Sequence, residues 1–125
     1  MGNKILVIDD DTDFQDLIGE VLAEYGFESV AALNAAEGLE ALAADPDVGL
    51  LILDVMMPGM DGYEVCRKIK ESEATALPII FLSAKTQPED IQRAYDAGGD
   101  DYIVKPFDND RLIETISRTL ADRPL

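Results

Sequence analysis

The sequence predicts an α/β fold in which one five-stranded parallel sheet is covered by helices on both faces. Five short apolar runs of strand length alternate along the chain with five segments whose apolar residues recur at helical spacing. The connections are short, and no internal repeat, linker or low-complexity stretch interrupts the alternation. This pattern is typical of a doubly wound domain, and we expect residues 1–125 to form a single (βα)5 unit.

The predicted strands are short aliphatic runs bounded by charged or turn-forming residues. In chain order they are expected at residues 4–8, 27–32, 50–53, 78–82 and 101–104. The third run is apolar throughout, ends on Asp54 and is followed by Pro58-Gly59. Such a run indicates a strand buried on both faces in the middle of a parallel sheet. Asp54 then stands at the carboxyl end of that strand, where open α/β sheets bind their ligands.

The predicted helices share apolar residues that recur every three or four positions. In chain order they are expected at residues 14–25, 34–45, 63–71, 86–96 and 112–120. The apolar stripe of the first consists of Phe14, Leu17, Ile18, Val21, Leu22 and Tyr25. We expect Asp11 to cap this helix and Gly26 to close it. Asn34 and Glu37 have the spacing of an N-capping box, and Pro88 lies in a first turn, where a missing N–H costs nothing.

The charge balance argues against several classes of partner. Lys and Arg total 10 against 26 Asp and Glu, a formal net charge of −16, so nucleic acid and membrane surfaces are not expected as direct partners. No apolar run approaches the roughly 18 residues of a membrane span, and no secretory signal pattern occurs. We therefore expect a cytoplasmic protein. The single cysteine, Cys66, falls in a helical apolar pattern and is interpreted as a small core residue.

Polar residues follow four of the five predicted strands. Because parallel strands end at one edge of the sheet, we expect Asp9, Asp10, Asp54, Ser83 and Lys105 to lie close together. Neighbouring carboxylates repel one another unless they share a cation or take up a proton. Hard oxygen ligands without histidine or cysteine favour Mg²⁺. Each residue taken singly has an ordinary reading as a turn, cap or solvated residue, but their joint placement favours a functional site.

The chemistry of this group points to phosphoryl transfer. An ionised aspartate beside Mg²⁺ can attack phosphorus, because the metal neutralises the phosphoryl oxygens. Lys105 would place a positive charge on a second phosphoryl oxygen, and Ser83 would donate a hydrogen bond to a third.

Four motifs resemble the receiver domain of two-component response regulators. They are Val7-Ile8-Asp9-Asp10, residues 53–62, Leu82-Ser83-Ala84 and residues 99–107, and the resemblance that they carry extends in register over nearly the whole chain. The resemblance implies the flavodoxin-like strand order 2-1-3-4-5. It makes Asp54 the phosphoacceptor and places Asp9, Asp10, Asp54 and the backbone carbonyl of Met56 in a Mg²⁺ site.

The resemblance also assigns the remaining edge residues. Ser83 and Lys105 would contact the phosphoryl group, and Tyr102 matches the switch aromatic of the family, whose ring turns inward as Ser83 moves. The alternative for Tyr102 is an ordinary exposed strand aromatic. The Lys105-Pro106 bond resembles one that is cis in the family. Ser83 stands where Thr is also frequent, and Gly99 stands where Ala is usual.

The resemblance implies a phosphorylation-dependent signalling switch that catalyses only its own phosphorylation and dephosphorylation. The donor would be a histidine kinase or a histidine phosphotransfer protein, and the fourth helix, fifth strand and fifth helix would form the face that acts on a downstream protein target or effector domain. Since the sequence ends at Leu125, we expect either a stand-alone regulator or a part of a longer protein.

Two other functions fit parts of the pattern. A phosphatase of the dehalogenase type also uses an aspartate nucleophile, but it needs a second aspartate two residues later, where this chain has Met56. A flavodoxin-like binding module needs a phosphate-binding loop after the first strand, where Asp9-Asp10-Asp11 would repel an unchelated phosphate.

Overall fold

The computed structural model describes residues 4–72 and 76–122, in which strands and helices alternate as predicted. The elements are β1 (Lys4–Ile8), α1 (Thr12–Glu24), β2 (Ser29–Ala32), α2 (Ala35–Ala44), β3 (Val48–Leu53), α3 (Gly62–Lys70), β4 (Ile79–Ser83), α4 (Pro88–Asp96), β5 (Asp101–Val104) and α5 (Asn109–Asp122). Most bounds agree with the prediction to within two residues. β2 begins at Ser29 rather than at residue 27, and Ser83 is the last residue of β4.

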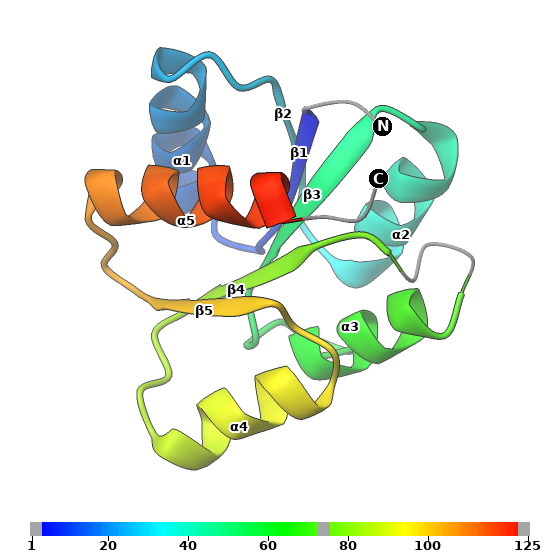
Figure 1. Ribbon diagram of the computed structural model, residues 1–125. Helices are drawn as coiled ribbons and strands as arrows, with labels where there is room; N and C mark the ends of the chain where they lie inside the picture. Colours follow the sequence, from blue (N-terminus) through cyan, green and yellow to red (C-terminus); the bar gives the residue numbers. More distant parts are fainter. Residues whose placement is uncertain (1–3, 73–75, 123–125) are drawn as a thin grey trace.

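The five strands form one parallel sheet in the order β2-β1-β3-β4-β5, which confirms the expected topology (Figure 1). The register explains why polar residues meet at its carboxyl edge. Ile8 of β1 pairs with Leu53 of β3, so the residues that follow them, Asp9 and Asp54, leave the sheet side by side. In the same way Ser83 pairs with Val104, which places Lys105 next to the end of β4.

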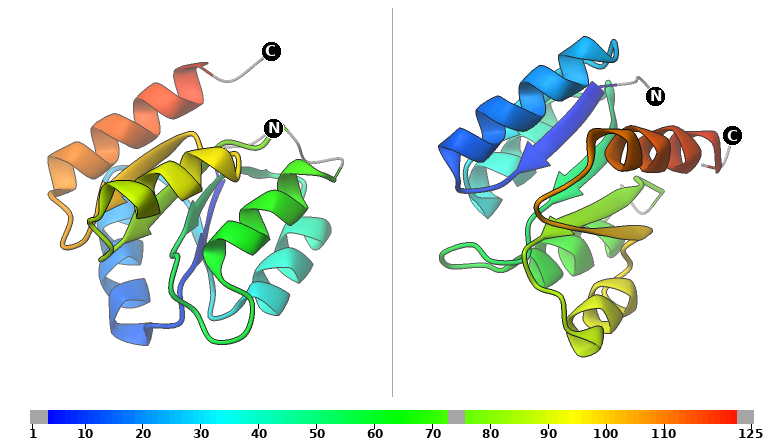
Figure 2. Two further views of the ribbon diagram at one scale, coloured as in Figure 1. Left: turned by 90° about the horizontal axis from the view of Figure 1, so that it is seen from below. Right: turned by 90° about the vertical axis from the view of Figure 1, so that its left-hand side faces the viewer.

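Helices cover both faces of the sheet, as Figure 2 shows. Successive side chains of a strand point to opposite faces of the sheet, so alternate residues belong to two separate hydrophobic cores. Ile5, Val7 and Ile52 pack with residues of α1 and α5. Leu6, Ile8, Leu51 and Leu53 pack with residues of α2, α3 and α4. Burial on both faces explains why the central runs are apolar without alternation.

The predicted helix-end signals are present. The Asp11 carboxylate accepts hydrogen bonds from two backbone N–H groups in the first turn of α1. Gly26, just beyond α1, has φ of 86°, a conformation that favours glycine. Asn34 Oδ1 accepts from the Glu37 N–H at 2.9 Å, while Glu37 Oε1 accepts from the Leu33 N–H at 3.3 Å. In a standard capping box Glu37 would accept from the N–H of the N-cap residue, Asn34. Here it accepts from the N–H of the residue before it, Leu33.

Two residues of the predicted apolar stripe, Leu17 and Tyr25, are exposed in the structure. The buried stripe of α1 consists of Ile18, Val21 and Leu22, whereas the Leu17 side chain is 52% exposed. A helical stripe about 100° wide cannot bury both Leu17 and Ile18 fully, and Ile18 faces the sheet. Leu17 instead lines a surface cavity of about 370 Å³ together with Phe107.

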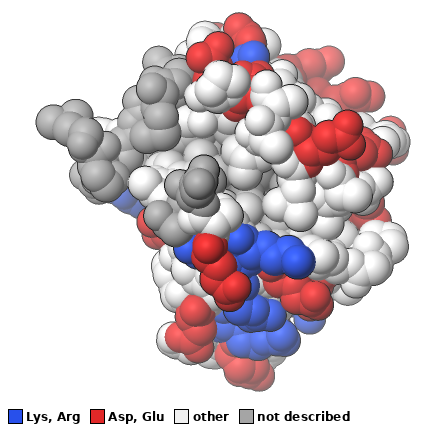
Figure 3. All heavy atoms as spheres, turned by 90° about the vertical axis from the view of Figure 1, so that its right-hand side faces the viewer, with Lys and Arg blue, Asp and Glu red and all other residues white. Residues whose placement is uncertain are grey.

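Surface charge is distributed unevenly. In the sequence no Lys or Arg occurs between Lys4 and Arg67, although acidic residues occur throughout that segment. Figure 3 shows a face on which most basic side chains lie near one another and acidic groups surround them. In the sequence, the last turn of α3 contains Arg67, Lys68 and Lys70. Among the described helices, none has the length and hydropathy that crossing a membrane requires.

Candidate functional site

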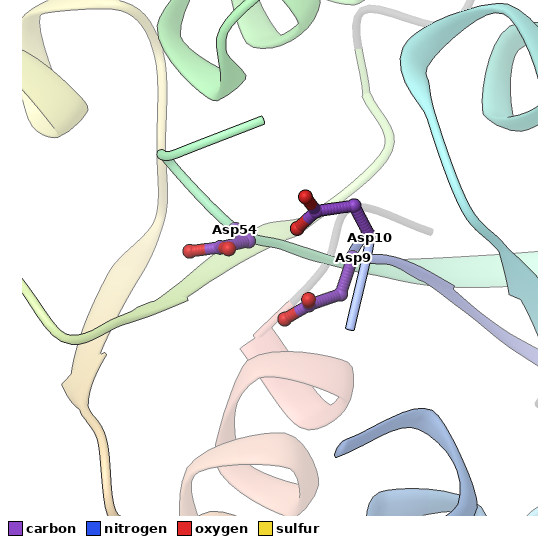
Figure 4. A group of neighbouring side chains, drawn as sticks. All are labelled: Asp9, Asp10 and Asp54. Carbon is purple, nitrogen blue, oxygen red and sulfur yellow. The ribbon is translucent and has the colours of Figure 1, made fainter. Parts of the chain in front are cut away.

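Three carboxylates meet where β1 and β3 end. Asp9 and Asp10 follow β1, Asp54 follows β3, and one oxygen from each lies within 4.8 Å of the others (Figure 4). Asp9 is 1% exposed and Asp54 is 8% exposed, whereas Asp10 is exposed. The structure thus brings together the three acids that the sequence predicted, in an arrangement that could hold a metal ion.

Asp9 is held at several of its atoms. Its Oδ1 accepts a hydrogen bond from the Asp11 N–H at 2.9 Å, and its Oδ2 accepts one from Lys105 Nζ at 2.7 Å. Its backbone N–H donates to the Ala32 carbonyl at 3.0 Å. A buried carboxylate needs such partners, because its desolvation is otherwise costly.

Asp54 lies in a more confined position. Its backbone N–H donates to the Ile8 carbonyl at 3.0 Å. A Cβ on Gly62, at the start of α3, would lie 2.2 Å from the Asp54 carbonyl oxygen, so only glycine allows α3 to begin this close. Burial raises the pKa of the Asp54 carboxyl, while the Lys105 ammonium lowers it and the Asp9 carboxylate raises it further. The site therefore favours a bound cation or proton.

Lys105 links the two buried acids and also contacts an aromatic ring that the sequence reasoning missed. Its Nζ lies 2.7 Å from Asp9 Oδ2, 3.8 Å from Asp54 Oδ2 and 4.0 Å from the centroid of the Phe14 ring. Phe14 in turn packs edge-on against Phe107 at 5.9 Å. The Lys105-Pro106 bond is cis, as expected. A cation over an aromatic face is attracted to it, so Phe14 helps to hold the ammonium at the sheet edge.

Ser83 and Tyr102 occupy neighbouring positions beside this edge. Ser83 is fully buried, and its Oγ accepts a hydrogen bond from the Lys85 N–H at 3.3 Å. Tyr102 is 6% exposed, stacks on Phe81 at 6.2 Å and donates its hydroxyl to the Lys85 carbonyl at 2.9 Å. Burial raises the pKa of Tyr102, and the Ser83 hydroxyl lowers it by a smaller amount. The alternative of an exposed strand aromatic is therefore wrong.

Met56 and Lys85 lie at the rim of the site. The Met56 side chain is 60% exposed and lines, together with Lys85 and Arg93, a cavity of about 370 Å³. Lys85 Nζ lies 3.7 Å from Asp90 Oδ1. Cys66, in contrast, is fully buried in α3, and burial raises the pKa of its thiol to about 11. The prediction of a small core residue is confirmed.

Comparison with protein families matches residues 5–117 to the response regulator receiver domain. An uncharacterised transcriptional regulatory protein of Bacillus subtilis, YrkP, is 42% identical over 90% of this chain and 47% of its own length. The transcriptional regulatory protein ResD of the same organism is 45% identical over 83% of this chain and 42% of its own length. The chain thus spans about half the length of the curated relatives it matches.

Solved structures show the same fold. The chemotaxis protein CheY4 of Vibrio cholerae superimposes with a TM-score of 0.88 at 28% identity, covering 95% of this chain and 99% of its own. A putative response regulator of Chloroflexus aurantiacus gives a TM-score of 0.91 at 30% identity, covering 97% of this chain and 99% of its own.

Proposed function

The chain belongs to the response regulator receiver domain family, whose members are phosphorylation-dependent signalling switches, and we propose that Asp54 is the residue that accepts the phosphoryl group. The observation that supports this assignment is the position of its carboxylate, which is 8% exposed at the sheet edge and has Lys105 Nζ 3.8 Å away. A nucleophile in such a place has a positive charge already in position to stabilise the phosphoryl oxygens.

The carboxylates of Asp9, Asp10 and Asp54 would hold Mg²⁺, with the backbone carbonyl of Met56 as a further ligand. The donor set fits, since it offers hard oxygen atoms and the described residues around it include no histidine or cysteine ligand. When bound, the ion neutralises phosphoryl oxygens. The absence of Lys and Arg between Lys4 and Arg67 adds to the negative field at this edge.

In the proposed step, an Asp54 carboxylate oxygen forms a bond to phosphorus while the bond between phosphorus and the imidazole nitrogen of a phosphohistidine donor breaks. The electron pair stays on that nitrogen, and Asp54 becomes an acyl phosphate. Lys105 Nζ, now 2.7 Å from Asp9, moves the short distance needed to contact a phosphoryl oxygen. The Ser83 hydroxyl donates a hydrogen bond to another oxygen, since Oγ lies at the end of β4.

Ser83 and Tyr102 would carry the signal away from Asp54. The Tyr102 hydroxyl interacts with Ser83 and donates a hydrogen bond to the Lys85 carbonyl. When Ser83 turns toward the phosphoryl group, its contact with this hydroxyl would change, and the hydrogen bond to Lys85 would change with it. The face formed by α4, β5 and α5 would then alter its preference for a downstream protein or effector domain. Asp54 would return to its resting state by hydrolysis within the same site.

The donor is proposed to be a histidine kinase or a histidine phosphotransfer protein. Several relatives are described as transcriptional or DNA-binding regulators, which fits a receiver domain that controls a separate effector. The acidic surface itself would not contact nucleic acid, because a net charge of −16 repels the phosphate backbone.

The assignment is tested by incubating the protein with MgCl₂ and a small phosphodonor such as acetyl phosphate and following the intact mass. We expect a single phosphoryl addition to the wild type and none to Asp54→Asn, which is isosteric but not nucleophilic. Asp47→Asn, at an exposed carboxylate outside the site, is the matched control and should be phosphorylated like the wild type. A phosphoryl group on Asp54→Asn would show that another residue is the acceptor.

A further inference from the structure

We propose that Gln15 is a positioning residue for the metal site, because its side-chain amide fixes the backbone of Asp9. The inference rests on the proposed Mg²⁺ site and extends it to a residue that contacts neither metal nor phosphoryl group. Gln15 lies near the start of α1 and is 8% exposed. A buried amide is costly to keep unless it is hydrogen bonded, so its partners indicate its role.

The Gln15 amide is surrounded by backbone carbonyl groups at the ends of two strands. Its Nε2 donates to the carbonyl oxygen of Val7 at 2.9 Å, of Asp9 at 3.1 Å and of Ala32 at 3.0 Å. All three neighbours are acceptors, so only the nitrogen end of the amide can face them. Two N–H hydrogens are therefore shared among three carbonyl groups.

These bonds close a ring around Asp9. The Asp9 N–H donates to the Ala32 carbonyl at 3.0 Å, and Gln15 donates both to that same carbonyl and to the carbonyl of Asp9. The Asp9 carbonyl belongs to the peptide group that joins Asp9 to Asp10. Its orientation sets the direction in which the Asp10 side chain leaves the backbone, so one amide constrains two of the three carboxylates.

Strand pairing fixes the N–H of Asp9, which donates to the Ala32 carbonyl, but not the Asp9 carbonyl. The ladder between β1 and β2 ends with the pair Ile8 and Ala32, one residue before Asp9. Gln15 extends the connection to the carbonyl of Asp9, which leads on to Asp10. Mg²⁺ requires nearly octahedral ligand geometry, whereas Ca²⁺ accepts a wider range of geometries. Loss of the Gln15 amide should therefore weaken Mg²⁺ binding more than Ca²⁺ binding.

The test is calorimetric titration of Gln15→Met with MgCl₂ and, separately, with CaCl₂. Methionine keeps the length of the side chain but removes the N–H donors. We expect the Mg²⁺ dissociation constant to rise about tenfold, the lower end of the range for residues that orient metal ligands, and the Ca²⁺ constant to rise less than about threefold. The matched control is Gln92→Met, whose amide bonds Asp96 on the surface of α4 at 2.9 Å. It should leave both constants unchanged.

A Mg²⁺ constant within about twofold of the wild type, or equal weakening of Mg²⁺ and Ca²⁺ binding, would overturn the role of Gln15. If Gln15→Met does not fold, Gln15→Asn retracts the amide by one methylene and is expected to shift the two constants in the same way. Asp10→Asn separates the two proposals. If this variant binds Mg²⁺ like the wild type, the metal site itself is wrong and the inference fails with it; if it binds weakly while both Gln15 variants bind normally, only the role of Gln15 fails.

Discussion

Mg²⁺ should stabilise the folded domain, and Asp10→Asn should remove most of that stabilisation. The three carboxylates each place an oxygen within 4.8 Å of the others, a separation at which two unit charges repel by about 3 kcal/mol at an effective dielectric constant of about 20. A divalent cation relieves this repulsion only in the folded state, because the unfolded chain does not hold Asp9 and Asp54 together. At a hundredfold excess over its dissociation constant, such a ligand adds about 2.7 kcal/mol to the free energy of unfolding.

Thermal unfolding followed by circular dichroism measures this effect, with NaCl added to the metal-free sample to match ionic strength. For a domain of 125 residues, 2.7 kcal/mol corresponds to a rise in Tm of roughly 10 °C. Asp10→Asn should melt higher than the wild type without Mg²⁺, since one repelling charge is gone, and should gain much less from the metal. Asp47→Asn, with an exposed carboxylate outside the cluster, should show the full rise. An equal rise in Asp10→Asn and in the wild type would refute a metal site that includes Asp10.

Three further predictions concern other parts of the site. Burial raises the pKa of Asp54, so the folded state binds a proton more readily than the unfolded state. The free energy of unfolding should therefore fall as pH rises from the ordinary aspartate pKa through the raised one. Urea unfolding from pH 4 to 7 should show a smaller fall in Asp54→Asn than in the wild type. Tyr102→Phe removes the 2.9 Å bond to the Lys85 carbonyl and should cost about 1 kcal/mol of unfolding free energy, while phosphorylation by acetyl phosphate continues; unchanged stability would argue against this bond. Met56→Asn should speed loss of the phosphoryl group more than Met56→Ala if an amide orients the attacking water. The two variants should speed it equally if the exposed thioether only shields the site. Single-turnover phosphate release distinguishes these cases, and an unchanged rate in both variants would mean that only the backbone carbonyl of Met56 has a role.

Much of the fold could be predicted because the strongest sequence signals are set by burial on both faces of the sheet. The run that ends at Leu53 is apolar at every position, and the structure buries every residue of β3. Cap residues then fix where α1, α2 and α3 begin, as the Asp11 carboxylate shows for α1. Since parallel strands end at one edge, the grouping of Asp9 and Asp54 follows from the topology alone. Their separation does not, because it depends on the register between β1 and β3.

The residues that support the site could not be identified from the sequence, because their roles depend on tertiary contacts. Gln15 is one polar residue among many in α1, and nothing in its spacing predicts that its amide meets carbonyls from two strands. Phe14 fits the apolar stripe of the same helix, and its contact with Lys105 joins residues far apart in the sequence. Leu17 fits the same stripe but is exposed, because periodicity does not distinguish the edge of a stripe from its centre.

Three aromatic rings of the core join α3 and β4 to the proposed output face. Phe81 of β4 lies between two other rings, with its centroid 5.9 Å from that of Tyr63 in α3 and 6.2 Å from that of Tyr102 in β5. Tyr63 donates its hydroxyl to the Asp90 carbonyl of α4 at 3.0 Å. A Cβ on Gly99 would lie 2.7 Å from the Phe81 ring, so an alanine at this position would require the ring to shift. Close-packed interiors have discrete arrangements rather than continuous ones, so a movement of the Tyr102 ring would require the Phe81 ring to adjust. α4 would respond as well, because Asp90 is hydrogen bonded to Tyr63 in the same row of rings.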